Sequence, residues 1–335
     1  MYLLFTKFKS PVFLGSSFAF IGSMTAAFAG GVSAALGYLG LIIGAIFAGL
    51  VYVVIAIVIK LVGVKWIDKV MPATVIGPTV AIIGLSLSTN AIADLMSGEV
   101  LNAAGEMACS PYLALLCGLV ALGVTIACSV HGKKMLRMIP FIIGILAGYA
   151  VAAVFTVIGI ACDVDALKII DFSLFSNIEW FPHFTFLEIF EGSLTPAEGG
   201  SIGQYIGTIA VAYIPVAFVV FAEHLADHKN ISSIIETDLL TDPGLSRTLL
   251  GDGVGSMVGA FFGGCPNTTY GESVGCVAIS GNASVSTTLL TALFAIAFSF
   301  IGVFTTFLAT IPGCVMGGGC ISLYGFIAGR GRKMV

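Results

Sequence analysis

Long apolar runs that carry almost no charge recur along this chain, and they decide what it can fold into. Residues 201–220 hold no charged side chain, and residues 36–61 hold one, Lys60. A helix that crosses a bilayer needs about 20 apolar residues. Only 10% of the 335 residues are charged and 58% are hydrophobic, whereas soluble domains carry about 25% charged residues. The sequence therefore predicts an all-α polytopic membrane protein and excludes a soluble enzyme or binding domain.

We predict ten spans, and the charged residues test this number. Basic residues cluster before the first span, in every second connection between spans and after the last span, whereas acidic residues dominate the remaining connections. If each span crosses the membrane, all the basic clusters lie on the same side. Positive charge favours the cytoplasmic side. The predicted spans are 11–30, 36–61, 72–92, 111–130, 139–161, 202–224, 248–265, 266–281, 284–310 and 312–328. The basic residues are Lys7, Lys9, Lys60, Lys65, Lys69, Lys133, Lys134, Arg137, Lys229, Arg247, Arg330, Arg332 and Lys333, and the acidic ones include Asp94, Glu99, Glu106, Asp163, Asp165, Asp171, Glu179, Glu188, Glu191 and Glu198.

Two pairs of similar segments indicate an internal repeat. "MPATVIG" at 71–77 resembles "IPGCVMG" at 311–317, and "SPVFLGSSFAF" at 10–20 resembles "CPNTTYGESVG" at 265–275. Both pairs are seven predicted spans apart, so partners would run in opposite directions, as in the inverted repeats of many transporters. Chance similarity among glycine-rich membrane segments is the alternative. Because two seven-span units make fourteen spans, we expect spans to be missing at both ends.

Four ionisable residues lie within "FAEHLADHKN", directly after an uncharged run. On a helix, Glu223 and Asp227 share one face, and His224 and His228 share another. A carboxylate in a membrane is costly, so Glu223 should face a cavity, a partner or a substrate. For His228 we expect instead the end of the helix and cytoplasmic water. The zinc-protease motif needs Glu directly after the first His, where Leu225 stands, so we predict neither a metal site nor a protease.

A second polar segment is "GGCPNTTYGESVG" at 263–275. Its Pro and β-prone residues favour an extended chain, after which Glu272 would open a short helix with free backbone N–H groups. Gly271 permits close backbone approach, and the "GSSFAF" segment offers Phe18 for stacking. Two carboxylates and two half-helix starts suit a small neutral molecule with donors and acceptors. Uracil has this pattern, as do other amides.

These segments resemble the nucleobase–ascorbate transporter family, and most closely its bacterial uracil permease branch. The resemblance lies in "GSSFAF", "AEH", "DLLTDPGLSRTLLGDGVGSMVGAFFGG", "PNTTYGE" and "IPGCVMGGGCISLYG", and it covers nearly the whole chain. It implies inverted seven-span repeats with two half-strand/half-helix segments, of which about ten of fourteen spans are present. It also implies a core domain at 1–63 and 201–310 and a gate domain at 64–200 and 311–335.

The same resemblance implies roles for individual residues. Glu223, Glu272, Gly271 and Phe18 would bind the substrate, the last two through their backbones. Proton coupling would fall to Glu223, Asp227 and His224, and Tyr324 would lie at the gate. Where the family signature has Asn and Thr, this chain has Ser273 and Ser280, which leaves xanthine or another purine base open.

The resulting prediction is proton-coupled uptake of uracil by alternating access across the inner or plasma membrane. We expect no enzymatic activity, no metal, no cofactor besides the coupling proton and no nucleic-acid partner, and a homodimer stays open. The alternatives are a purine-base permease, an anion carrier for bicarbonate or sulfate, and a membrane enzyme that uses the His/Asp cluster. Two carboxylates argue against the anion carrier.

Overall fold

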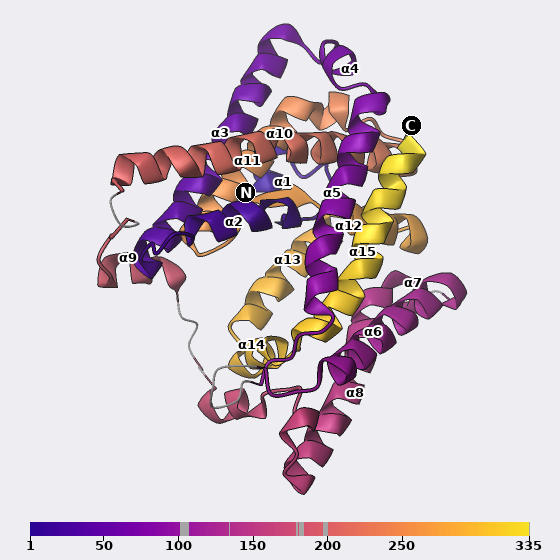
Figure 1. Cartoon of the computed structure of the whole chain (residues 1–335). Coiled ribbons are helices and arrows are strands. Elements are labelled where there is room, and N and C mark those ends of the chain that lie inside the picture. The colour runs from indigo at the N-terminus through magenta and orange to yellow at the C-terminus, as the bar shows by residue number, and fades with distance from the viewer. Residues whose placement is uncertain (101–106, 134, 179, 181–183, 197–199, 335) are drawn as a thin grey trace. The chain divides into compact units, whose positions relative to one another are not determined.

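The computed structural model describes residues 1–100, 107–133, 135–178, 180, 184–196 and 200–334. Helices make up most of the chain, and two short strands complete it (Figure 1). The α-helices are α1 (Tyr2–Phe5), α2 (Ile21–Ala27), α3 (Ala34–Val62), α4 (Ile67–Val70), α5 (Ala73–Asp94), α6 (Pro111–His131), α7 (Met135–Met138), α8 (Pro140–Cys162), α9 (Glu188–Glu191), α10 (Ile202–Ile235), α11 (Leu245–Phe261), α12 (Gly271–Ser280), α13 (Val285–Ser299), α14 (Gly302–Ala309) and α15 (Gly313–Met334). The strands are β1 (Leu14–Ser16) and β2 (Asn267–Thr269), and the shorter turns of helix are η1 (Phe18–Phe20), η2 (Asp165–Leu167), η3 (Phe172–Asn177), η4 (Thr185–Leu187) and η5 (Leu240–Gly244).

Several helices are long and apolar enough to cross a bilayer. Among the described residues there are five such helices, or six if α13 and α14 are taken as one broken span bent by 86°. The prediction of a mostly helical protein with several membrane-spanning helices is confirmed. The number of ten crossings stays a prediction, and four residues used to argue it, Glu106, Lys134, Glu179 and Glu198, lie outside the described residues.

Helix α10 is longer than the sequence indicated. It begins at a capping box in which Ser201 and Gln204 satisfy each other's backbone N–H groups, and it ends at Glu236 in the left-handed conformation. The predicted span stopped at residue 224. Buried side chains continue at helical spacing beyond that point, at Leu225, His228 and Ile231, and they keep the helix packed inside the protein. The expectation that His228 lies in water past the helix end is therefore wrong.

The described residues form two compact units by their internal contacts. The first comprises residues 1–80 and the described part of 183–290, and the second comprises the described parts of 81–182 and 291–333. These units do not test the predicted boundaries of the core and gate domains, which stay a prediction.

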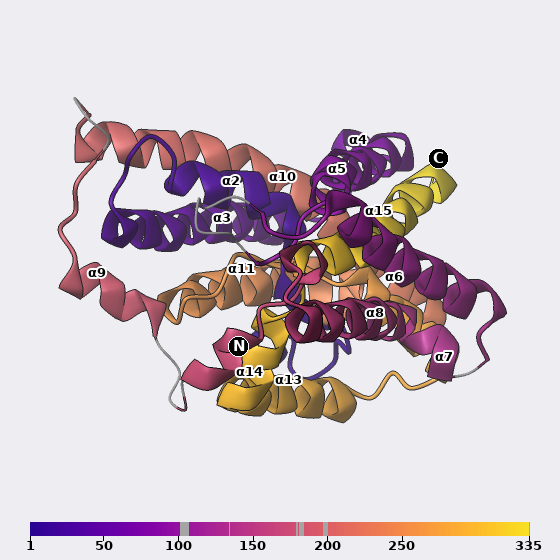
Figure 2. The ribbon, with the colours of Figure 1, turned by 60° about the horizontal axis from the view of Figure 1, so that its bottom comes forward.

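In the first unit, α3 packs against both α10 and α11. Figure 2 shows α3 and α10 lying next to each other, and in Figure 1 the two helices cross. Small residues allow the close approach of α3 and α11, because a Cβ on Gly253 would lie 2.8 Å from the carbonyl oxygen of Gly49.

The two strands pair with each other inside this unit. β1 and β2 are antiparallel, with Leu14 opposite Thr269 and Ser16 opposite Asn267. A short helical segment follows each strand, at η1 and α2 after β1 and at α12 after β2. The extended segments that the sequence predicted at "PVFLGSS" and "PNTTYG" are thus present, and their backbone groups satisfy one another, as chain buried away from water requires.

The second unit is built around α6 and α8, which pack along their lengths. Its core gathers small side chains from these helices and from the start of α15, among them Cys117, Ala121, Ala152 and Val315. The Tyr149 hydroxyl lies 2.9 Å from that of Thr310 and ties α8 to the segment before α15.

Candidate functional site

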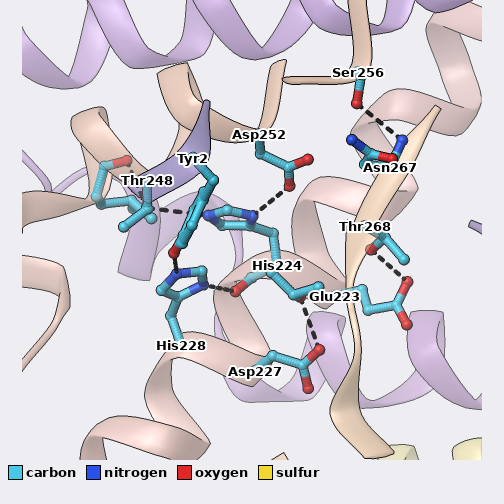
Figure 3. A network of polar contacts seen from close by, with 12 residues as sticks. Tyr2, Glu223, His224, Asp227, His228, Thr248, Asp252, Ser256, Asn267 and Thr268 are labelled. Atoms are coloured by element: carbon cyan, nitrogen blue, oxygen red, sulfur yellow. Dashed lines mark hydrogen bonds and ion pairs between the residues drawn. The ribbon is translucent and has the colours of Figure 1, made fainter. Parts of the chain in front are cut away.

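Helix α10 presents its four ionisable side chains in two directions. Figure 3 shows Glu223 and Asp227 on the side of the strand β2, whereas His224 and His228 lie on the side of Tyr2 and Asp252. The cause is helical spacing, since Glu223 and Asp227 are four residues apart, as are His224 and His228. The cluster is thus two sites with different surroundings.

Threonines of β2 hold the carboxylates on the first side. Thr268 Oγ1 donates to Glu223 Oε2 at 3.2 Å, and Thr269 Oγ1 donates to Asp227 Oδ2 at 2.8 Å. Asp227 is only 4% exposed, whereas Glu223 keeps part of its surface. Glu223 is therefore the carboxylate of this pair that a molecule in an adjoining space would meet.

Glu272 approaches the same place from another segment. It lies in the first turn of α12, directly after Gly271, and its side chain is partly exposed. Its helix, α12, contacts α10, which carries Glu223. The first N–H groups of a helix have no partner within the helix, so the start of α12 adds hydrogen-bond donors beside the two acceptors.

Phe18 lies at the start of η1, directly after β1. Its side chain is 38% exposed, and η1 contacts α10. The backbone here is anchored to the opposite segment, because the N–H of Ser17 donates to the carbonyl of Pro266 at 2.9 Å. The structure therefore brings Phe18, Glu223, Gly271 and Glu272 into the same unit, around the β1–β2 pair.

On the second side of α10, His224 pairs with a carboxyl group of α11. His224 Nδ1 lies 2.9 Å from Asp252 Oδ2, and Nε2 lies 3.1 Å from Thr248 Oγ1. The side chains of His224 and Asp252 are both completely buried. Tyr52 of α3 closes this space, with its ring at 72° to the imidazole and the ring centroids 5.9 Å apart.

His228 is held by the N-terminal segment. Its Nδ1 lies 2.8 Å from the carbonyl oxygen of His224, and its Nε2 lies 2.8 Å from the Tyr2 hydroxyl, which also contacts Ser10 Oγ at 2.8 Å. A carbonyl can only accept, so Nδ1 carries the proton and Nε2 accepts from Tyr2 when the ring is neutral. The His224 and His228 rings stack with centroids 4.1 Å apart.

Sequence reasoning assigned no role to Asp252, Tyr2 or the two threonines. A signal for Asp252 was present, because a carboxylate inside an apolar helix marks a functional candidate and "LLGDGVGSMVGAF" has this character. No comparable signal singles out Tyr2 or Thr269, whose contacts are 226 and 42 residues distant along the chain.

Tyr324, the predicted gate residue, belongs to the second unit. It lies on α15, is 4% exposed, and its carbonyl oxygen would lie 2.6 Å from a Cβ on Gly84 of α5. This is a close helix–helix contact within that unit. The gating role of Tyr324 stays a prediction.

The arrangement on the β2 side suits binding better than bond-breaking. It offers two partly exposed carboxylates, a helix start and an aromatic ring. Among the residues that the structure describes, no group of three or more His, Cys, Asp or Glu side chains is placed to hold a metal ion. A small neutral molecule that both donates and accepts hydrogen bonds would satisfy these groups.

Known proteins similar to this chain are permeases. A model of the permease family matches residues 1–335. The uracil permease of Bacillus caldolyticus is 37% identical over 335 residues, which are 100% of this chain and 70% of that protein. The uracil permease of Escherichia coli K12 is 33% identical over the same shares of the two chains.

A solved structure is also similar. The transmembrane domain of a cyanobacterium bicarbonate transporter, BicA, aligns with a TM-score of 0.58 and 17% identity, and the alignment covers 95% of this chain and 76% of that one. At this identity the likeness shows the fold alone. Together with the apolar helices, these relatives make the chain a multi-pass protein of the inner or plasma membrane.

Proposed function

Because the chain belongs to the nucleobase–ascorbate transporter family of permeases, we propose that it carries uracil into the cell together with a proton. The relatives that support this substrate are named uracil permeases and span the whole of this chain. Family membership by itself fixes neither the substrate nor the coupling to a proton. The names of the relatives support uracil, and the chemistry of the site supports both the substrate and the proton.

The observation that supports the proposal is that α10, which carries Glu223, contacts α12, which carries Glu272 in its first turn. The two carboxylates come from positions 49 residues apart in the sequence. Uracil has two ring N–H donors for these carboxylates and two carbonyls for backbone N–H groups near Gly271 and Phe18. Phe18 is exposed enough to lie against a flat ring.

The proton is assigned to Glu223 together with Asp227. His224, for which a coupling role was also expected, lies on the other side of α10 and pairs with Asp252. Glu223 and Asp227 lie one helical turn apart, and each accepts a hydrogen bond from β2. Two negative charges this close in a place poor in water are costly. A proton taken up together with the substrate would remove one of them, which links proton binding to substrate binding.

Transport would follow alternating access between two domains. In this proposal a core domain at 1–63 and 201–310 holds the site, a gate domain at 64–200 and 311–335 moves against it, and Tyr324 lines the gate. The β1 and β2 segments, each followed by a short helix, support an inverted repeat, with ten crossings taken from a fourteen-span architecture.

Ligand binding to the purified chain tests the substrate. The full chain is heated in detergent with uracil, xanthine or bicarbonate, and its unfolding temperature is recorded. We expect uracil alone to raise this temperature, in wild type and in Glu236→Gln, where an exposed carboxylate at the end of α10 is neutralised. Glu272→Gln should lose the effect. Stabilisation by xanthine and not by uracil would make a purine base the substrate. An equal rise in unfolding temperature with uracil in Glu236→Gln and Glu272→Gln would refute the proposed site.

A further inference from the structure

We propose that Asp252 and His224 form a second proton-binding site, separate from Glu223, in which Asp252 is a neutral carboxylic acid. The pair lies on the opposite side of α10 from the β2 carboxylates (Figure 3). Whether it adds a proton to the transport cycle rests on the proposed function, but the binding of a proton by the pair does not.

The direction of the hydrogen bonds carries the inference. Thr248 Oγ1 lies 3.0 Å from the carbonyl oxygen of Leu245, which can only accept. The single hydroxyl proton of Thr248 is used there, so His224 Nε2 must donate to Thr248 across 3.1 Å. The other ring nitrogen, Nδ1, then has a lone pair in a neutral imidazole and accepts across the 2.9 Å contact to Asp252 Oδ2. With these hydrogen-bond directions, the proton between His224 Nδ1 and Asp252 Oδ2 belongs to Asp252.

The surroundings oppose the ionised alternative. Asp252 Oδ1 is buried and has no hydrogen-bond partner, and an unpaired charged oxygen removed from water is costly. Within the part of the chain that the structure describes, His224 is the one basic side chain paired with Asp252. A neutral acid donating to a neutral imidazole leaves no charge on either group.

The neighbouring titratable groups favour the same state. His228 stacks on His224 at 4.1 Å, and its contact with the carbonyl of His224 fixes a proton on Nδ1 without requiring a positive charge. Tyr2 of α1 adjoins His228, and Tyr52 of α3 packs edge-on to His224. Glu223 points away toward Thr268. His228, Tyr2 and Tyr52 thus bring no negative charge to His224 that would hold it as a cation.

A second buried polar atom without a hydrogen-bond partner lies beside His224. The Tyr52 hydroxyl, like Asp252 Oδ1, is buried without a hydrogen-bond partner. Tyr52 and Asp252 both flank His224, from α3 and α11. Buried polar atoms of this kind are commonly satisfied by a buried water molecule.

Infrared spectroscopy of the purified full chain without uracil tests the site. The carbonyl stretch of a neutral carboxylic acid is separate from that of a carboxylate. We expect a band at neutral pH that shifts in heavy water, disappears reversibly as the pH is raised, and is absent from Asp252→Asn. Asp242→Asn is the matched control, because Asp242 is exposed and ion-paired with Lys9 at 2.6 Å, and it should keep the band.

His224→Gln guards against a folding defect in the first variant. It removes the imidazole acceptor but leaves the acid, so the band should move in frequency and not vanish. Coincident spectra of wild type and Asp252→Asn in this region, or a band insensitive to both pH and His224→Gln, would overturn the proposal. Because no substrate is present, a failure of uracil binding would leave this result unaffected.

Discussion

The hydroxyl of Thr269 donates a 2.8 Å hydrogen bond to the carboxylate of Asp227, and both side chains are almost completely removed from solvent. Thr269 belongs to β2, which pairs with β1 near the N-terminus, and Asp227 lies in the C-terminal part of the 34-residue helix α10. The bond therefore fixes the turn of α10 that carries Glu223 relative to the strand that precedes Gly271 and Glu272. Positioning of the two site carboxylates depends on this contact.

Replacement of Thr269 by Val should destabilise the protein and weaken substrate binding together. Val has the shape of Thr but cannot donate, so one hydrogen bond to a buried carboxylate is lost, at a cost of about 1–3 kcal/mol in the free energy of unfolding. The measurement is the unfolding temperature with and without uracil. Thr269→Ser keeps the hydroxyl and should retain most of the stability and most of the uracil binding. A Ser variant as impaired as the Val variant would show that packing of the methyl group, and not the hydrogen bond, matters.

Replacement of Glu223 by Gln should uncouple transport from the pH gradient. The amide oxygen of Gln still accepts from Thr268, so the local structure is retained, but the side chain can no longer bind and release a proton. We expect exchange of labelled for unlabelled uracil to continue at a reduced rate and accumulation driven by a pH gradient to be lost. Glu236→Gln, on the exposed end of the same helix, should accumulate uracil like wild type. Concentrative uptake by Glu223→Gln would assign the proton elsewhere.

The sequence predicted the helices and the two broken segments because those follow from local properties. Runs such as 36–61 and 139–161 are apolar over the length of a span, and Pro followed by β-prone residues marks the strands. The sequence failed at His228, which it placed in water. Its burial depends on Tyr2, 226 residues away, and a side chain that remote leaves no trace in local periodicity. The pairing of His224 with Asp252 was missed for the same reason.

Replacement of Gly15 by Ala should disturb the substrate site through β1. A Cβ at this position would lie 2.5 Å from the ring of Tyr270, whose hydroxyl donates to the carbonyl of Ser16 at 2.8 Å. The ring must move, and Tyr270 directly precedes Gly271 at the start of α12. We expect the unfolding temperature and uracil binding to fall. Gly22→Ala, in α2, meets nothing within 4 Å and should change neither, and a Gly15→Ala protein that binds uracil normally would show that the strand tolerates the shift.

Replacement of Gly253 by Ala should separate α3 from α11 and loosen the second proton site. The added Cβ would lie 2.8 Å from the carbonyl oxygen of Gly49 and 2.9 Å from Cβ of Tyr52. One is a backbone atom of α3 and the other is attached directly to its backbone, so the helices must move apart, and overpacking of this kind costs about 1–3 kcal/mol. Because Tyr52 packs against His224, the strain should reach the pair that His224 forms with Asp252.

The matched control lies on the same helix. A Cβ on Gly259 meets nothing within 4 Å, and Ala is favoured over Gly inside a helix by about 1 kcal/mol. Gly259→Ala should therefore keep or raise the unfolding temperature, while Gly253→Ala lowers it and shifts the carboxylic acid band assigned to Asp252. If Gly253→Ala and Gly259→Ala had the same unfolding temperature and the same carboxylic acid band, α3 and α11 would not be packed closely at Gly49 and Gly253. The side chains around His224 would then not depend on that packing.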